Sequence, residues 1–295
     1  MDRVPPVRAG IGIKLIQPSH GRRRPNEGLI ATMNMNVTDA RDASEVNDWA
    51  ARLILGDQVG IAQPPDWLAQ SYTTFRTQVM DPDYPCFFGT QAERLGDMYY
   101  SFVTDRDITH LPSTMTSFVR LASRCGSAKR NLAVFFEPDS SPSDHGQFRA
   151  LSWQILQYLH DQDVEPASAG IGPEPSDVFW EFCFAATQMF VVGCSPTYQR
   201  RRSRNLGAGF ILLFQPRTVF VDAVTKRDIG AEARATIRDR LAAWDRTAVH
   251  PDLGAYGDPA YREWKQYFLP DDDAPETGTC PFSSHGRTLP VAPGS

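Results

Sequence analysis

Cys86 has a local sequence unlike that of the other four cysteines of this 295-residue chain. It stands in PDYPCFFG, directly after a proline and before two phenylalanines. A cysteine in such a setting can be a small apolar core residue, half of a disulfide, or a thiolate ligand of a reactive centre. An odd number of cysteines without a recognisable secretory signal favours free thiols. The core residue and the ligand therefore stay open as hypotheses for Cys86.

Two acidic residues adjoin stretches that are otherwise apolar. Glu137 follows NLAVFF, and Glu181 lies inside VFWEFCF. A carboxylate in an apolar strand costs free energy unless a partner compensates its charge. That partner is either an arginine of the chain or a cation that arrives with a substrate, and the sequence leaves both open.

Four arginines, Arg200, Arg201, Arg202 and Arg204, crowd together in TYQRRRSRN. Such a run is usually a solvated surface, but arginines also hold carboxylates and phosphates by forked hydrogen bonds. The run is short, and the formal net charge of the chain is −5. Nucleic-acid binding is not indicated, because neutralising a phosphate backbone needs a surplus of Lys and Arg.

His160 is a further candidate ligand, close to Asp161 and Asp163 in LHDQD. Imidazole is a common metal ligand, and a nearby carboxylate can hold its second nitrogen. Alternatively, the histidine is simply favoured by the dipole at the end of a helix.

Several familiar catalytic motifs are absent from the sequence. It contains no HExxH, no paired CxxC, no Walker phosphate loop, no GxSxG and no complete GxGxxG between a strand and a helix. The chemistry of those motifs is therefore not indicated, and no flavin or nicotinamide fingerprint is present.

The periodicity of the chain predicts an α+β fold with a mainly antiparallel sheet in a single globular domain. Aromatic and β-branched runs predict strands at 97–103, 131–138, 178–192 (as a hairpin), 209–215 and 217–223. Helical spacing predicts helices at 48–57, 65–79, 113–125, 148–163 and 230–246, with Cys86 in a loop. Strands joined directly as often as through helices argue against a doubly wound sheet.

Composition divides the chain into a body and two tails. Residues 1–45 are rich in charge and breakers and predict a disordered or loosely ordered tail, residues 46–282 one globular domain, and residues 283–295 a flexible tail. Hydrophobic residues make up 41% and charged residues 22%, as in soluble globular proteins. No apolar run approaches the ~20 residues of a membrane span, so we expect a cytoplasmic protein.

Taken in order, the dense local signatures of the chain resemble the YqcI/YcgG family from about residue 45 to about residue 282. The segments that carry the resemblance are YPCFFG, GDMYYSFV, VFFEP, WQILQYLHDQD, WEFCFAATQMFVV, SPTYQRRRSRNLG, FQPR, EWKQYFLPDD and CPF. No single segment is specific, and the set together is. Two departures are Ala186, where a glycine is expected, and the unusual length of the arginine run.

The resemblance implies haem chemistry. Characterised members of the family are haem-dependent N-oxygenases of guanidine nitrogens, among them the L-arginine Nω-hydroxylase of the D-cycloserine pathway. It implies a monooxygenase that binds haem b, uses O2, draws electrons from a ferredoxin or flavin reductase, and converts L-arginine to Nω-hydroxy-L-arginine in natural-product biosynthesis. A haem-binding sensor or carrier without turnover is the alternative.

The same resemblance assigns roles to the candidate residues. A thiolate ligand makes haem iron reactive towards O2, so Cys86 is the expected axial ligand, with His160 as the alternative. Phe87 and Phe88 would offer apolar surface to the porphyrin. The cations expected at the haem propionates are Arg200, Arg201, Arg204 and Arg217. The carboxylates expected to bind the substrate guanidinium are Glu181 and Glu137.

Overall fold

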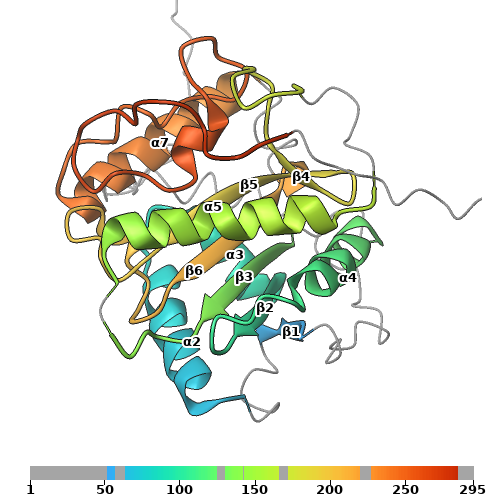
Figure 1. The fold of residues 1–295 in the computed structure, drawn as a ribbon. Helices are drawn as coiled ribbons and strands as arrows, with labels where there is room; N and C mark the ends of the chain where they lie inside the picture. Colours follow the sequence, from blue (N-terminus) through green and yellow to red (C-terminus); the bar gives the residue numbers. More distant parts are fainter. Residues whose placement is uncertain are drawn as a thin grey trace, which may run out of the picture. The chain divides into compact units, whose positions relative to one another are not determined.

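The computed structural model describes residues 52–56, 64–124, 130–141, 143–165, 172–219 and 227–284, with the backbone alone at 124 and 227–233. The predicted tail at 1–45 and residues 285–295 of the other predicted tail lie outside this part of the chain. A six-stranded mixed sheet lies at the centre, in the order β1-β2-β3-β6-β5-β4 (Figure 1). Its strands are β1 (Ile54–Leu55), β2 (Met98–Val103), β3 (Asn131–Phe136), β4 (Phe182–Phe184), β5 (Thr187–Cys194) and β6 (Ile211–Pro216).

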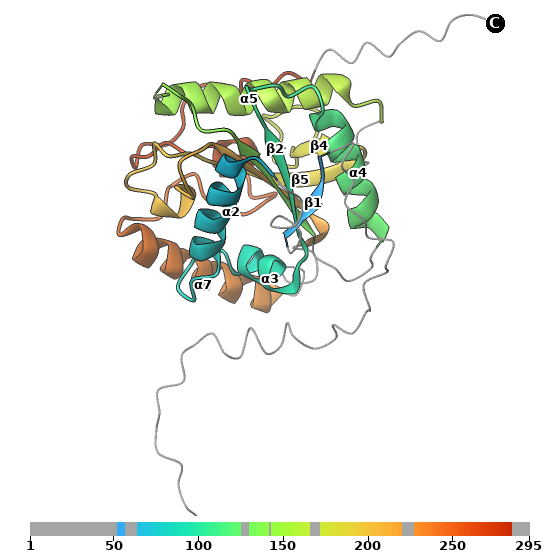
Figure 2. The ribbon, with the colours of Figure 1, turned by 90° about the horizontal axis from the view of Figure 1, so that it is seen from below.

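Helices cover both faces of this sheet. They are α2 (Asp66–Val79), α3 (Phe87–Leu95), α4 (Leu111–Arg124), α5 (His145–Gln162) and α7 (Arg227–Asp245), with short 3-10 helices η2 (Arg202–Arg204) and η3 (Glu263–Gln266). Seen from below, α4 and α5 lie on one side of the sheet, and α2, α3 and α7 lie on the other (Figure 2). None of the described helices is long and apolar enough to cross a membrane.

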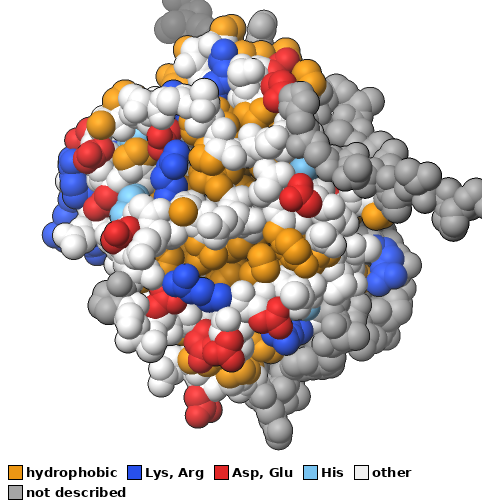
Figure 3. Space-filling model, in the orientation of Figure 1, with side chains coloured by type: hydrophobic (Ala, Val, Ile, Leu, Met, Phe, Trp, Pro, Cys, Tyr) orange, Lys and Arg blue, Asp and Glu red, His pale blue; other side chains and the backbone are white. Residues whose placement is uncertain are grey.

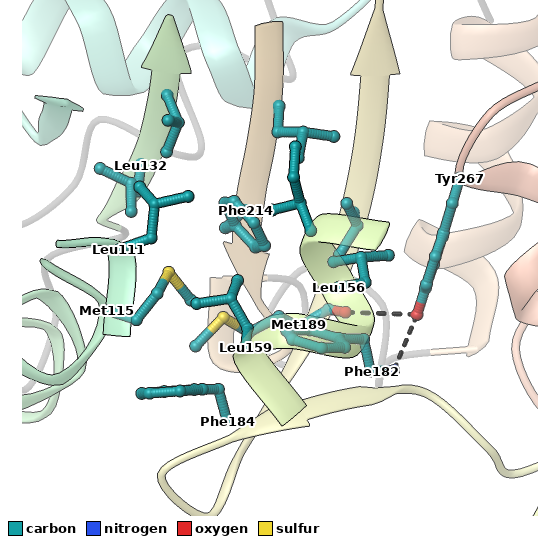
Figure 4. Close-up of a cluster of buried hydrophobic side chains, with 14 of the residues drawn as sticks. Leu111, Met115, Leu132, Leu156, Leu159, Phe182, Phe184, Met189, Phe214 and Tyr267 are labelled. Carbon is teal, nitrogen blue, oxygen red and sulfur yellow. Dashed lines mark hydrogen bonds between the residues drawn. The ribbon is translucent and has the colours of Figure 1, made fainter. Parts of the chain in front are cut away.

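The alternation of side chains along the strands builds a separate core on each face. Leu132 and Val134 of β3 point into the core beneath α4 and α5, whereas Ala133 and Phe135 point towards α2 and α3. Figure 4 shows the first core, in which the Tyr267 hydroxyl accepts a hydrogen bond from the amide of Phe182 and donates one to the carbonyl of Met189. The sheet therefore divides the molecule into two apolar compartments.

The predicted fold class is confirmed. Four of the five strand pairings are antiparallel, and β2 and β3 form the one parallel pair among the described strands. A parallel pair needs a crossover connection, and α4 lies in it. The predicted strands in 97–103, 131–138, 178–192 and 209–215 and the predicted helices at 65–79, 113–125, 148–163 and 230–246 are all present within a few residues.

Three local predictions were wrong. The helix predicted at 48–57 is replaced in its described part by β1, which pairs with β2 at the edge of the sheet. Cys86 is not inside a loop, because it caps α3. The strand predicted at 217–223 does not form at its start, where Thr218 and Val219 are helical, and residues 220–223 lie outside the described part. The chain leaves the sheet at this point. Arg217, the first residue after β6, donates a hydrogen bond from its side chain to Glu181.

The β4–β5 hairpin closes through a two-residue loop of alanines. Phe184 pairs with Thr187, so Ala185 and Ala186 form the loop, and their φ angles are 47° and 56°. Two positive φ angles are the pattern of a type I′ turn, which favours Asn and Gly. This explains why a glycine would be the expected residue at position 186.

Candidate functional site

Cys86 is the N-cap of α3, and its sulfur accepts a hydrogen bond from the Gly89 amide at 3.4 Å. The residue is half-buried in the core beneath α2 and α3. Burial raises the pKa of the Cys86 thiol, while hydrogen bonds from the Gly89 amide and the Gln215 side chain oppose that rise. A sulfur with these two donors is suited to carry negative charge once burial is compensated, as by a metal ion.

His160 lies on the opposite side of the sheet from Cys86. It is a buried residue in the last turn of α5, and its ring packs edge-on against Phe282 with centroids 4.9 Å apart. Phe282 belongs to the core beneath α4 and α5, whereas Cys86 packs against the other core. The sheet therefore separates the two predicted alternative iron ligands, Cys86 and His160, and the two could not bind the same iron in this structure.

Glu181 is held by Arg217. The carboxylate accepts two parallel hydrogen bonds from the guanidinium, from Nε at 2.5 Å and from Nη2 at 2.7 Å. The Glu181 side chain is fully buried, and that of Arg217 is 23% exposed. Of the two partners that the sequence left open, the structure provides the arginine of the chain. In this forked geometry both oxygens of Glu181 are used by the guanidinium of Arg217.

A second carboxylate, Glu263 of η3, lies beside this pair. Its Oε1 is 3.8 Å from Nη2 of Arg217, and its Oε2 accepts a hydrogen bond of 3.3 Å from Gln266. Burial and the nearby charge of Glu181 raise the pKa of Glu263 to about 8, although the charge of Arg217 acts to lower it. The guanidinium of Arg217 also lies over the Tyr256 ring, 3.4 Å from its centroid. We call Glu181, Glu263, Arg217 and Tyr256 the acid-pair site.

The sequence analysis did not find Glu263 or Tyr256. A signal for Glu263 exists in REWKQYF, where a glutamate stands among a tryptophan, a tyrosine and a phenylalanine that are all buried. An acidic residue in such company is rarely left without a specific partner. No comparable signal marks Tyr256, which lies in a loop.

The arginine run binds the chain itself. Arg201, 2% exposed, donates to the carbonyls of Pro270, Ala248 and Asp272 and to the Asp273 carboxylate. Arg200 also pairs with Asp273, at 2.6 Å. The run therefore anchors the segment after η3, and a role at haem propionates, which stays a prediction, would need these bonds to be exchanged.

Arg204, the last arginine of the run, is buried as well. It donates to the carbonyls of Gln266, Tyr267 and Gly193. These acceptors lie in η3, directly after it, and near the end of β5. Arg204 thus helps to fix the helical turn that carries Glu263.

Glu137 lies at the carboxyl end of β3, away from the acid-pair site. Its Oε2 accepts the Asp105 amide at 3.2 Å. It lines a small hollow with Arg106 and Asp139, which pair at 2.7 Å. The apolar lining comes from Val103, Phe136, Phe148, Leu151 and Phe210. Figure 3 shows apolar side chains in a band along α5, with charged side chains at its border.

The aromatic pair after Cys86 is only partly available to a ligand. Phe88 is buried, Phe87 is half-buried, and their ring centroids are 4.6 Å apart. Both belong to the first turn of α3. A contact of these rings with a porphyrin stays a prediction.

One end of strand β6 connects Cys86 with the acid-pair site. Gln215, whose side chain reaches the Cys86 sulfur, is two residues before Arg217. Arg217 also donates its amide to the carbonyl of Gln188, near the start of β5. The candidate ligand Cys86 and the carboxylate Glu181 thus both contact residues at the same end of β6, whereas Glu137 lies at the other end.

Comparison with known proteins decides the family. The profile of the YqcI/YcgG family matches residues 75–283. The chain belongs to the YqcI/YcgG family. Its segments YPCFFG, WEFCF and EWKQYF, which carry Cys86, Glu181 and Glu263, lie inside the matched region.

Three relatives are each 32% identical to the chain. One is named "Putative N(omega)-hydroxy-L-arginine synthase DcsA" from Streptomyces lavendulae, and the match covers 80% of this chain and 91% of that protein. The others are the uncharacterized proteins YqcI and YcgG of Bacillus subtilis (strain 168), each matched over 74% of this chain and 88% and 89% of their own length. No solved structure matches the chain.

The residues around Cys86 fit a haem thiolate in their chemistry. Its sulfur stands at the N-terminus of a helix and accepts a backbone amide, and both features stabilise a thiolate. No group of three or more His, Cys, Asp or Glu side chains in the described part could hold a metal by itself. Haem iron takes most of its donors from the porphyrin, so Cys86 alone would be enough to hold it on the protein side.

Proposed function

We propose that the chain hydroxylates a guanidine nitrogen with O2, with L-arginine as substrate and Nω-hydroxy-L-arginine as product. The family and the relative named as a hydroxyarginine synthase support the reaction class. The observation that carries the guanidine substrate is the acid-pair site. There a buried carboxylate already grips one guanidinium by its fork, and a second buried carboxylate adjoins it.

Haem b is the proposed cofactor, and Cys86 would hold its iron. When bound, it would supply the activation of O2 that a nitrogen hydroxylation needs, with two electrons from a ferredoxin or a flavin reductase. On the protein side, the Gly89 amide and the Gln215 side chain would hold charge on the Cys86 sulfur. Gln215 is thus a positioning residue, since it acts through Cys86.

The acid-pair site would bind and orient the substrate. A carboxylate that takes a guanidinium in parallel hydrogen bonds fixes the plane of that group and presents one nitrogen edge. Burial of Glu181 and Glu263 keeps water from competing for these bonds. The ring of Tyr256, over which Arg217 lies, also contacts the ring of Phe179, with centroids 6.0 Å apart.

The decisive experiment is mass spectrometry of aerobic incubations with hemin-reconstituted protein, a reductase system and L-arginine. The proposal expects a product heavier than arginine by one oxygen atom, with the heavier label from ¹⁸O₂ and none from labelled water. Homoarginine and agmatine are tested in parallel. The reaction class is wrong if haem-saturated protein consumes reductant without oxidising any of these guanidines, as a haem sensor or carrier would.

A further inference from the structure

The acid-pair site holds more negative than positive charge when all its groups are ionised. Glu181 and Glu263 contribute two carboxylates, and Arg217 is the cation that both approach. Among the residues that the structure describes, the other titratable groups that face Glu263 are Tyr256 and Tyr267, which are neutral below the range where tyrosines ionise. The site is balanced only when one carboxylate carries a proton or when a second cation enters.

The hydrogen bonds of the two carboxylates identify which one can still accept bonds from that cation. Both oxygens of Glu181 already accept short bonds from Arg217. Glu263 has only the 3.3 Å bond from Gln266 and the loose 3.8 Å approach of Arg217 among the interactions found in the described chain. Glu263 therefore retains the acceptor capacity that a second forked guanidinium would use.

We infer that Glu263 binds the guanidinium of the substrate beside Arg217, and that it releases a proton to solvent when it does so. This rests on the proposed guanidine substrate. Before binding, the proton on Glu263 balances the site. After binding, the guanidinium of the substrate replaces the proton, so that two cations balance the two carboxylates. Because the pKa of Glu263 is raised to about 8, guanidine affinity should grow as pH rises towards that value and level off above it.

The test is a titration with methylguanidinium, the fragment common to alkylguanidine substrates, followed by ligand-observed NMR. Wild-type protein should bind it at least about tenfold more tightly at about pH 8.5 than at about pH 6.5, because the ionised fraction of Glu263 rises that much. Methylurea, which has a similar shape without the charge, should not bind. Calorimetry in two buffers of different ionisation enthalpy should show release of a proton near pH 7.

Three variants make the result specific. Glu263→Gln should lose about tenfold or more of the affinity at the higher pH and lose the pH dependence, whereas Glu263→Asp should keep the pH dependence with weaker binding. Glu276→Gln, in a partly buried glutamate that pairs with Arg149 at 3.1 Å outside the site, should bind like the wild type. Thermal unfolding establishes that each variant is folded.

The outcomes separate this inference from the proposed reaction. Binding of methylguanidinium that is unchanged in folded Glu263→Gln overturns the inference, even if the protein oxidises arginine. Conversely, pH-dependent binding through Glu263 supports the inference, even if no guanidine is hydroxylated.

Discussion

Ala186 is an exposed residue with a left-handed backbone, and its methyl group contributes little to packing. For an L-residue with a Cβ this conformation costs roughly 1–2 kcal/mol, whereas glycine adopts it freely. The β4–β5 hairpin nevertheless forms, because Phe182 and Phe184 are buried in the core and the Ala185 amide donates to Asp163.

Replacing Ala186 by glycine should therefore stabilise the protein. We expect Ala186→Gly to raise the free energy of unfolding by about 1 kcal/mol, since the relief of the positive φ exceeds the added entropy of the unfolded chain. Ala150→Gly, at an exposed position inside α5, is the matched control and should lower stability by about 0.5–1 kcal/mol. Chemical denaturation measures both; a loss of stability in Ala186→Gly would show that the turn is not strained.

Glu263 makes stability depend on pH. Its pKa in the folded protein, about 8, lies above its ordinary value of 4.5, so the folded chain binds this proton more tightly than the unfolded chain does. The associated stability is complete below about pH 4.5 and is lost as the pH rises towards 8.

A variant that lacks this titrating group should gain stability relative to the wild type as the pH rises. We expect the unfolding free energy of Glu263→Gln, minus that of the wild type, to increase by about 2–4 kcal/mol between about pH 5 and about pH 9. Urea unfolding at several pH values tests this, with Glu276→Gln as the control that should show no such trend. A difference that is constant with pH would mean that Glu263 is ionised throughout.

At the residue scale, the sequence predicts Glu181 but not its neighbourhood. A glutamate inside VFWEFCF signals a buried charge with a partner. That partner is Arg217 of FQPR, for which the resemblance implies a place at the haem propionates. Glu263 and Tyr256 come to the same place through a 3-10 helix and a loop, whose paths depend on tertiary contacts rather than on periodicity. Hence the sequence marks Glu263 as an acidic residue among buried aromatic residues but does not place it beside Glu181, and it does not mark Tyr256 at all.

At the scale of elements, the longer strands were predicted correctly, whereas the short elements β1 and α3 were not. Strands β2, β3, β5 and β6 have runs of aromatic and β-branched residues that leave little doubt about their type. Strand β1 has two residues and follows a helix-like pattern, so only its pairing with β2 defines it. Helix α3 begins at FFG, where a glycine in the first turn obscures the helical pattern.

The placement of α3 and α5 on opposite faces of the sheet gives a clear spectroscopic prediction for haem ligation. If Cys86 is the axial ligand, the ferrous CO complex of reconstituted protein should absorb at the long wavelength typical of a thiolate. Cys86→Ala should lose this feature, and His160→Ala should keep it, because the sheet stands between the two residues. The reverse pattern would assign the iron to His160 and place the haem in the other compartment.

At the scale of the whole molecule, Asp271 links the arginine run to the segment after η3. Its carboxylate accepts the amides of Gln199, Arg200 and Arg201 at 2.9–3.2 Å. Three backbone donors thus depend on one side chain that is about seventy residues away in sequence.

Truncation of Asp271 should release this link. We expect Asp271→Ala to lower the free energy of unfolding by about 2 kcal/mol, because these amides lose a charged acceptor and the Arg201 amide is partly buried. Asp272→Ala, next in the chain but exposed and with one side-chain hydrogen bond in the described structure, from the Ala274 amide, should cost less than about 0.5 kcal/mol. Equal effects of the two substitutions would show that the link contributes nothing to stability.

The burial of Arg201 also constrains the order in which the protein can mature during synthesis. Its guanidinium donates hydrogen bonds to Pro270, Asp272 and Asp273. At 5–20 residues per second, the ribosome needs roughly 4–14 s to add the intervening seventy residues. During that interval the strands of the sheet can pair. The guanidinium of Arg201 still lacks most of its hydrogen-bond acceptors, and Phe282 has not yet entered the core. The final part of the chain therefore completes the fold. A nascent chain stalled before residue 270 would still expose Arg201 and the part of the core that Phe282 covers, and chaperones could bind there.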